Sequence, residues 1–105
     1  MQRVDPKRVF PEAEAAELRV KTLPMVLDSI KHVSETEAGF SVRLGSAVHD
    51  LVLVSDWMQI ERACNPFLRF SLTVESNEGP ITLDISGPTG TKDFLSTEMA
   101  LSRWV

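Results

Sequence analysis

The chain has 105 residues, 43% of them hydrophobic and 25% charged, which is typical of a single globular domain with a modest core. Its formal net charge of -4 argues against non-specific binding to nucleic acid and against a polybasic membrane patch, because both depend on clustered Lys and Arg. No apolar run reaches the roughly 20 residues that span a bilayer, and a single Cys excludes an internal disulfide. We therefore expect a cytoplasmic protein with no membrane or nucleic-acid partner.

The N-terminal part predicts an arm followed by a helix. Residues 1–10 show no period and are expected to be a loosely held arm of the single domain, 1–105. Pro11 suits a first helical position, and Pro24 is expected to end the helix. A shallow stripe of mostly small side chains recurs at helical spacing: Val9, Ala13, Ala16, Val20 and Leu23. Such a stripe predicts a helix that docks at the periphery of the domain.

Two strands joined by a tight turn are predicted next. Residues 25–35 are expected to be extended, with Ile30, His32 and Ser34 on one face and Lys31, Val33 and Glu35 on the other. The turn 36–39 ends at Gly39, which can adopt positive φ. Phe40, Val42 and Leu44 then alternate with polar residues, the pattern of a half-buried strand.

The segment 47–64 contains the main ambiguity, because its run Leu51-Val52-Leu53-Val54 favours a strand when considered alone. The wider window favours one helix, since Leu53, Trp57, Ile60 and Cys64 recur at helical spacing. Ser46 is expected to cap this helix and Pro66 to stop it.

A second hairpin and a last helix complete the prediction. Residues 68–75 and 81–86 each alternate between apolar and polar side chains, and 76–80 is rich in turn-forming residues. Residues 91–103 are predicted helical, with Phe94, Leu101 and Val105 on one face beside Leu95 and Met99. The predicted fold is therefore α+β: a four-stranded antiparallel sheet made of two hairpins in αββαββα order, with the helices on its apolar face. Residues 28–64 and 68–104 share a hairpin-then-helix plan, so a pseudo-symmetric pair is also predicted.

Cys64 is the first candidate functional residue. A thiol near Arg62 and Arg69 could have a lowered pKa and act as a nucleophile, a redox sensor or a soft-metal ligand. Against this, Cys64 lies at the C-terminal end of its helix, where the dipole disfavours a thiolate, and it continues an apolar stripe. A packed core cysteine is the competing interpretation.

Charged residues around Cys64 form a second candidate group, made of Glu61, Arg62 and Arg69. Arg69 lies on the polar face of its strand, where it could bind a small anionic ligand, and Thr73, Thr82 and Asp84 are expected to share that face. The competing interpretation is a solvated face with weak ion pairs.

Other candidates carry weaker patterns. The loop 87–92 lies between a strand and a helix, as phosphate-binding loops do, but two residues separate Gly87 from Gly90, where the Walker pattern needs four. His49-Asp50 could be an acid–base pair, although adjacent helical residues point in different directions. Trp57 and Trp104 are expected in the core or a subunit contact. One Cys and two His cannot build the usual four-ligand zinc site, and no cofactor or metal is predicted.

Two segments resemble a group of small uncharacterised bacterial proteins. Glu61-Arg62-Ala63-Cys64-Asn65-Pro66-Phe67-Leu68-Arg69-Phe70 is similar to the group's Glu-Arg-x-Cys-Cys-Pro-Phe-x-x-Phe pattern, and residues 83–95 match its Gly-Pro-x-Gly-x-x-x-Phe-Leu segment. The layout agrees over residues 26–96. The second Cys of the group's pair is Asn65 here, so this chain lacks the vicinal dithiol that could bind a soft metal. The resemblance implies no activity.

The sequence favours a non-catalytic binding or assembly module over an enzyme, because it contains no recognised catalytic signature. We expect this module to self-associate, with a homodimer as the simplest case. Two Trp and four Met in so short a chain support a contact surface. The alternative is a thiol- or ligand-responsive protein centred on Cys64, with Arg62 or Arg69 tuning the thiol.

Overall fold

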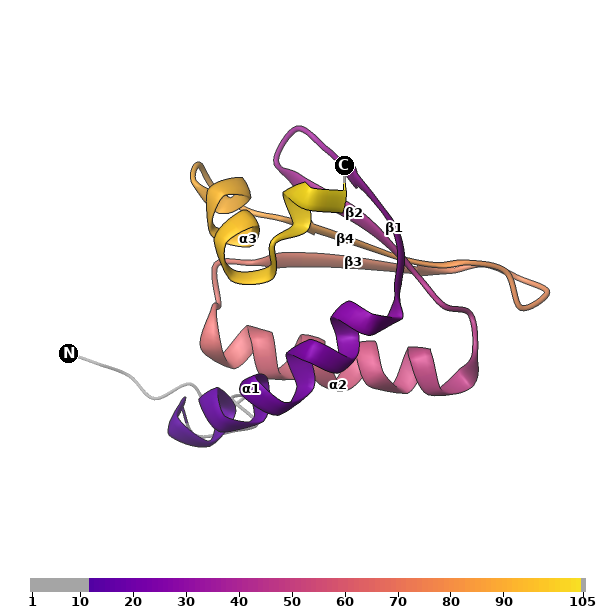
Figure 1. Cartoon of the computed structure of the whole chain (residues 1–105), viewed down its shortest axis with the longest axis horizontal. Helices are drawn as coiled ribbons and strands as arrows, with labels where there is room; N and C mark the ends of the chain where they lie inside the picture. Colours follow the sequence, from indigo (N-terminus) through magenta and orange to yellow (C-terminus); the bar gives the residue numbers. More distant parts are fainter. Residues whose placement is uncertain (1–11, 105) are drawn as a thin grey trace.

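The structure is a computed structural model that describes the backbone of residues 12–104 and the side chains of residues 14–103. These residues form an α+β fold in which a four-stranded antiparallel sheet is covered by helices on one face (Figure 1). The elements in chain order are α1 (Glu12–Ser29), β1 (Ile30–Glu35), β2 (Gly39–Leu44), α2 (Val48–Cys64), β3 (Arg69–Val74), β4 (Ile81–Ser86), α3 (Thr91–Met99) and the 3-10 helix η1 (Leu101–Trp104). The predicted fold class is confirmed, while the predicted arm 1–10 and the predicted contacts of Val9, Ala13, Trp104 and Val105 lie outside the described part.

The sheet has the strand order β1-β2-β4-β3, so each hairpin contributes one central strand and one edge strand. The second strands of the two hairpins, β2 and β4, pair with each other, with Val42 opposite Leu83. This order agrees with the predicted repetition of a hairpin-then-helix plan. It leaves β1 and β3 as the two edges.

The predicted alternation in β1 is wrong at its start. The register shifts between Ile30 and His32, so that Ile30 pairs with Leu44 and His32 pairs with the next residue, Arg43. A bulge of this kind adds one residue to a strand and reverses the alternation beyond it. Ile30 and Val33 therefore both face the helices and are buried, whereas His32 is exposed. The residues before Ile30 belong to α1 and not to a strand.

Pro24 does not end α1, contrary to the prediction, but lies inside it on the exposed side. The inward face of α1 continues past Pro24 without a break. It is a stripe of buried or half-buried side chains: Ala15, Leu18, Arg19, Thr22, Leu23, Val26 and Leu27. Packing of this stripe against α2 outweighs the loss of one backbone hydrogen bond at the solvent side. The predicted stripe was also on the wrong face, since Val20 is 76% exposed.

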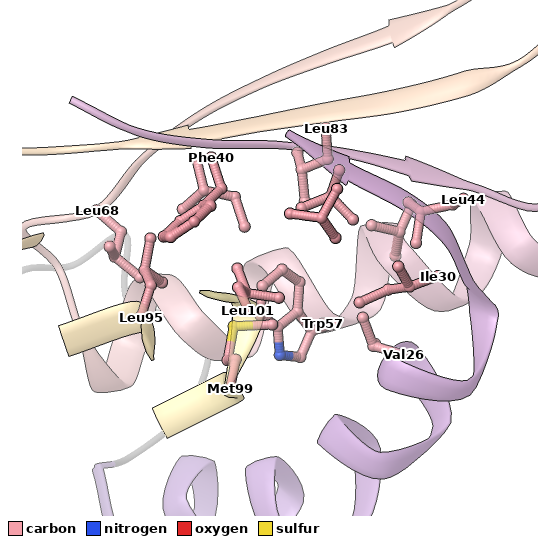
Figure 2. Close-up of a cluster of buried hydrophobic side chains, with 14 of the residues drawn as sticks. Val26, Ile30, Phe40, Leu44, Trp57, Leu68, Leu83, Leu95, Met99 and Leu101 are labelled. Atoms are coloured by element: carbon pink, nitrogen blue, oxygen red, sulfur yellow. The ribbon is translucent and has the colours of Figure 1, made fainter. Parts of the chain in front are cut away.

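Trp57 occupies the centre of the core, as predicted, with none of its surface exposed. Figure 2 shows its indole between side chains that descend from the sheet, such as Phe40 and Leu83, and side chains from α1 and from the C-terminal segment. Its ring meets Phe70 of β3 edge to face, with centroids 5.6 Å apart. One helix, α2, therefore supplies the residue that joins the sheet to the rest of the helical layer.

The C-terminal helix is shorter than predicted because the chain turns at Ala100, which has a left-handed φ of 53°. α3 ends at Met99, and η1 then returns Leu101 to the core beside Leu95 and Met99 (Figure 2). Phe94 is half-buried and stacks edge to face on Phe67.

Gly39 and the N-terminal end of α2 both differ from the prediction. Gly39 does not have positive φ; it is required because a Cβ there would overlap the backbone oxygen of Ile85 in β4. Ser46 does not cap α2, whose N-cap is Ala47. Asp50 organises this end instead: its carboxylate accepts hydrogen bonds from the Ala47 backbone N–H at 3.1 Å and from the Ser29 hydroxyl at 2.8 Å. It thereby ties the end of α1 to the start of α2.

Candidate functional site

Glu61 is fully buried and lies at the centre of a charged cluster between the three α-helices. Its Oε2 accepts from Arg19 Nε of α1 at 2.5 Å, and its Oε1 accepts from Asn65 Nδ2 at 2.7 Å. Arg19 Nη1 also donates to Glu98 Oε1 of α3 at 3.0 Å. We call Arg19, Glu61, Asn65 and Glu98 the Arg19 cluster.

The main role of the Arg19 cluster is structural, because its buried hydrogen bonds link α1 to α2. A buried carboxylate is stable only when it is paired and hydrogen-bonded, and both Glu61 oxygens have a partner. Within the described part of the chain, Arg19 Nη2 and Trp57 Nε1 are buried donors with no hydrogen-bond acceptor. Sequence reasoning missed Arg19 and Glu98. The available signal was the spacing of Glu61, four residues after Trp57 and hence on the buried face of α2.

The four residues singled out from the sequence do not converge on one site. Glu61 points inward to Arg19, whereas Arg62, the next residue of α2, is exposed. Cys64 is the last residue of α2 and is half-buried. Arg69 begins the edge strand β3 with its side chain exposed. The structure therefore joins Glu61 to residues not considered from the sequence and separates it from the two arginines proposed beside it.

The uncovered face of the sheet is polar and carries Arg69, as expected. Arg69 pairs in register with Ser86, and Thr73 pairs with Thr82, while Asp84 lies between Ser41 and Ser71. Arg43 is exposed on the same face. Arg69 is thus placed on an open surface of hydroxyl groups, where it can contact an anionic group.

The loop 87–92 folds as a strand-to-helix turn beside a shallow hollow of about 360 Å³. Gly90 has a φ of 98°, which favours glycine, and the Thr91 hydroxyl donates to the backbone oxygen of Pro88 at 2.7 Å. Lys92 Nζ lies 2.8 Å from Glu35 Oε2. The lysine that would have to meet a phosphate is therefore paired with a carboxylate of β1.

His49 and Asp50 approach each other at the start of α2, with Nε2 and Oδ1 3.6 Å apart. Asp50 is already occupied by Ser29 and by the Ala47 backbone, and His49 is almost fully exposed. The pair therefore belongs to the helix start and lies outside any enclosed pocket.

An open, apolar groove of about 670 Å³ is lined by residues of α1 and α2. We call it the α1–α2 groove, and its lining residues are Met25, Val48, His49, Val52, Leu53 and Asp56. Val48 is 81% exposed, Met25 57% and Val52 55%. Sequence reasoning missed this surface because Val48 and Val52 fall beside the buried stripe of α2, where apolar residues are expected to be covered. Val48 and Val52 are four residues apart and so lie on the same face of α2, and this spacing could have revealed a second apolar stripe.

The fold and these surfaces define an α+β domain with one open sheet face and an apolar groove on its helical face. No family model, curated protein or solved structure matches the chain. Over the described residues, no helix is long and apolar enough to cross a membrane, and no group of three or more His, Cys, Asp and Glu side chains is arranged to hold a metal ion.

Proposed function

We propose that the protein is a non-catalytic assembly module that self-associates through the α1–α2 groove. The observation that carries this proposal is the exposure of three large apolar side chains, Met25, Val48 and Val52, around one concave surface. Apolar side chains exposed singly are ordinary, whereas a concave cluster of them is typical of interaction sites.

The energetic reason is the cost of leaving this surface in water. Full burial of one Val or Met side chain stabilises by about 1.5–3 kcal/mol. Val48, Val52 and Met25 are 81%, 55% and 57% exposed, so an interface that covers all three gains about two such increments in each copy before the cost of association. The groove lies on the helical layer, so the sheet face with Arg69 stays open in the assembly.

The test is the solution mass across concentration, measured by size-exclusion chromatography with light scattering. We expect the 11.7 kDa chain to form a larger species at high micromolar concentration. Val52→Ser should shift it toward the monomer, and Val74→Ser, a control with 52% exposure at the end of β3, should behave as the wild type. A wild-type chain that is strictly monomeric throughout the series would refute the proposal.

Three further expectations from the sequence stay predictions. They are a cytoplasmic location, membership of the group of small bacterial proteins, and a small anionic ligand at Arg69. The thiol-responsive alternative also stays a prediction, and alkylation of Cys64 across pH tests it: reaction only after denaturation would exclude it.

A further inference from the structure

We infer that the partner in the α1–α2 groove is a second copy of this chain, docked with its α2 antiparallel to the first α2 about a two-fold axis between Val52 and Leu53. The inference rests on the proposed self-association and adds its geometry. It places His49 of each copy against Asp56 of the partner subunit.

Helix geometry places the groove residues of α2 on one stripe. Val48, Val52 and Asp56 follow at intervals of four, and His49 and Asp56 are seven residues apart, which is close to two full turns. The stripe therefore has an apolar centre, a histidine toward the start of the helix and a carboxylate about 10 Å further along it.

The arrangement of these residues is self-complementary only when the two helices are antiparallel. A two-fold interface is isologous, so residue i meets residue j and residue j meets residue i. An axis between positions 52 and 53 brings position 49 opposite position 56 twice, with Val52 and Leu53 of the two copies between these contacts. A parallel pair would instead place Asp56 against Asp56, which like-charge repulsion disfavours.

The side chains suit this contact chemically. The imidazole of His49 is 83% exposed and can donate a hydrogen bond to a carboxylate from either ring nitrogen that carries a proton. Asp56 is exposed, and no ion pair within 4 Å occupies it among the described residues. Met25 of α1 forms the opposite wall of the groove, where its flexible thioether can adapt to the incoming helix.

Charge exchange across the axis tests this geometry. His49→Asp should create two Asp–Asp contacts per dimer, and Asp56→His two His–His contacts, so each variant alone should dimerise at least about tenfold more weakly than the wild type. Mixing the two variants should restore wild-type affinity as a heterodimer, since both contacts then pair Asp with His. Native mass spectrometry of the mixture distinguishes the heterodimer from the two homodimers.

Cysteine cross-linking gives the direction of the helices in a Cys64→Ser background. Val52→Cys should form a disulfide with the same position of the second copy, because the two positions lie about 1.5 Å apart along the helix axis. Val48→Cys should form no such disulfide, because the two cysteines would lie about 13 Å apart along the helix axis. If the wild type dimerises but the mixture shows no preference for the heterodimer, or Val48→Cys cross-links as readily as Val52→Cys, the inference is overturned and the proposed function stands. A monomeric wild type overturns both.

Discussion

Replacement of Glu61 by Ala tests the Arg19 cluster most directly. The change removes the buried carboxylate that accepts from Arg19 Nε and from Asn65 Nδ2. Arg19 then keeps only Glu98, at the exposed end of the cluster, while most of its guanidinium stays out of water: its side chain is 16% exposed. The variant thus leaves a mostly buried cation with its nearest counter-charge missing.

The structure gives the size of the expected effect. Removing one partner of a buried ion pair destabilises a protein by about 3–5 kcal/mol, because the remaining charge is uncompensated. Glu61 is fully buried, so its loss belongs to this range. Glu98 is 40% exposed, and Glu98→Ala should change the free energy of unfolding by only about 0–1 kcal/mol. The two variants remove the same chemical group from the same arginine and differ in burial.

Equilibrium unfolding in urea, followed by tryptophan fluorescence, to which the buried Trp57 contributes, measures both changes. Arg19→Leu combined with Glu61→Leu removes both charges and should recover most of the stability lost in Glu61→Ala. If Glu61→Ala unfolds within about 1 kcal/mol of the wild type, or no more easily than Glu98→Ala, then the buried pair does not hold the helices together and the reasoning fails.

Two backbone positions give further predictions. Pro24→Ala should raise the free energy of unfolding by about 1–3 kcal/mol, since it restores a helix hydrogen bond at an exposed position, and an unchanged urea midpoint would show that the proline is accommodated without cost. Gly39→Ala should lower thermal stability, by about 1–3 kcal/mol or more, because its Cβ would overlap the backbone of Ile85 and force β2 from β4; a melting temperature equal to that of the wild type would contradict this.

The order and faces of the elements could be predicted wherever one pattern ran through a whole element. β4 is the clearest case, because Ile81, Leu83 and Ile85 alternate without interruption and are all buried. Prediction failed where tertiary packing overrode a local rule. Pro24 is an ordinary helix terminator, and only the contact of Val26 with the core explains why α1 continues through it. The bulge before His32 leaves no mark in the alternation of β1, since either register places some apolar residues inward.

The candidate site was less predictable than the fold. Glu61 was singled out for its nearness to Cys64 in sequence, yet its partner Arg19 is 42 residues away and lies on a helix whose inward face was misassigned. A long-range ion pair has no local signature, so a single sequence contains nothing that joins these two residues. The exposure of Val48 and Val52 is hidden for a similar reason: whether an apolar residue beside a buried stripe is covered depends on the position of α1, which contributes Met25 to the same groove.

The sequence distances within the Arg19 cluster have a consequence for folding kinetics. Arg19 bonds to Glu61 and Glu98, which lie 42 and 79 positions further along the chain, so the first bond closes a loop that contains the first hairpin and the second closes a loop that contains both hairpins. Contacts that close such large loops form late unless they belong to the folding nucleus. We therefore expect the cluster to be largely absent from the transition state, so that its loss accelerates unfolding and leaves the folding rate nearly unchanged. In that case the cluster sets how long the folded protein persists, while the sheet and Trp57 set how quickly it forms.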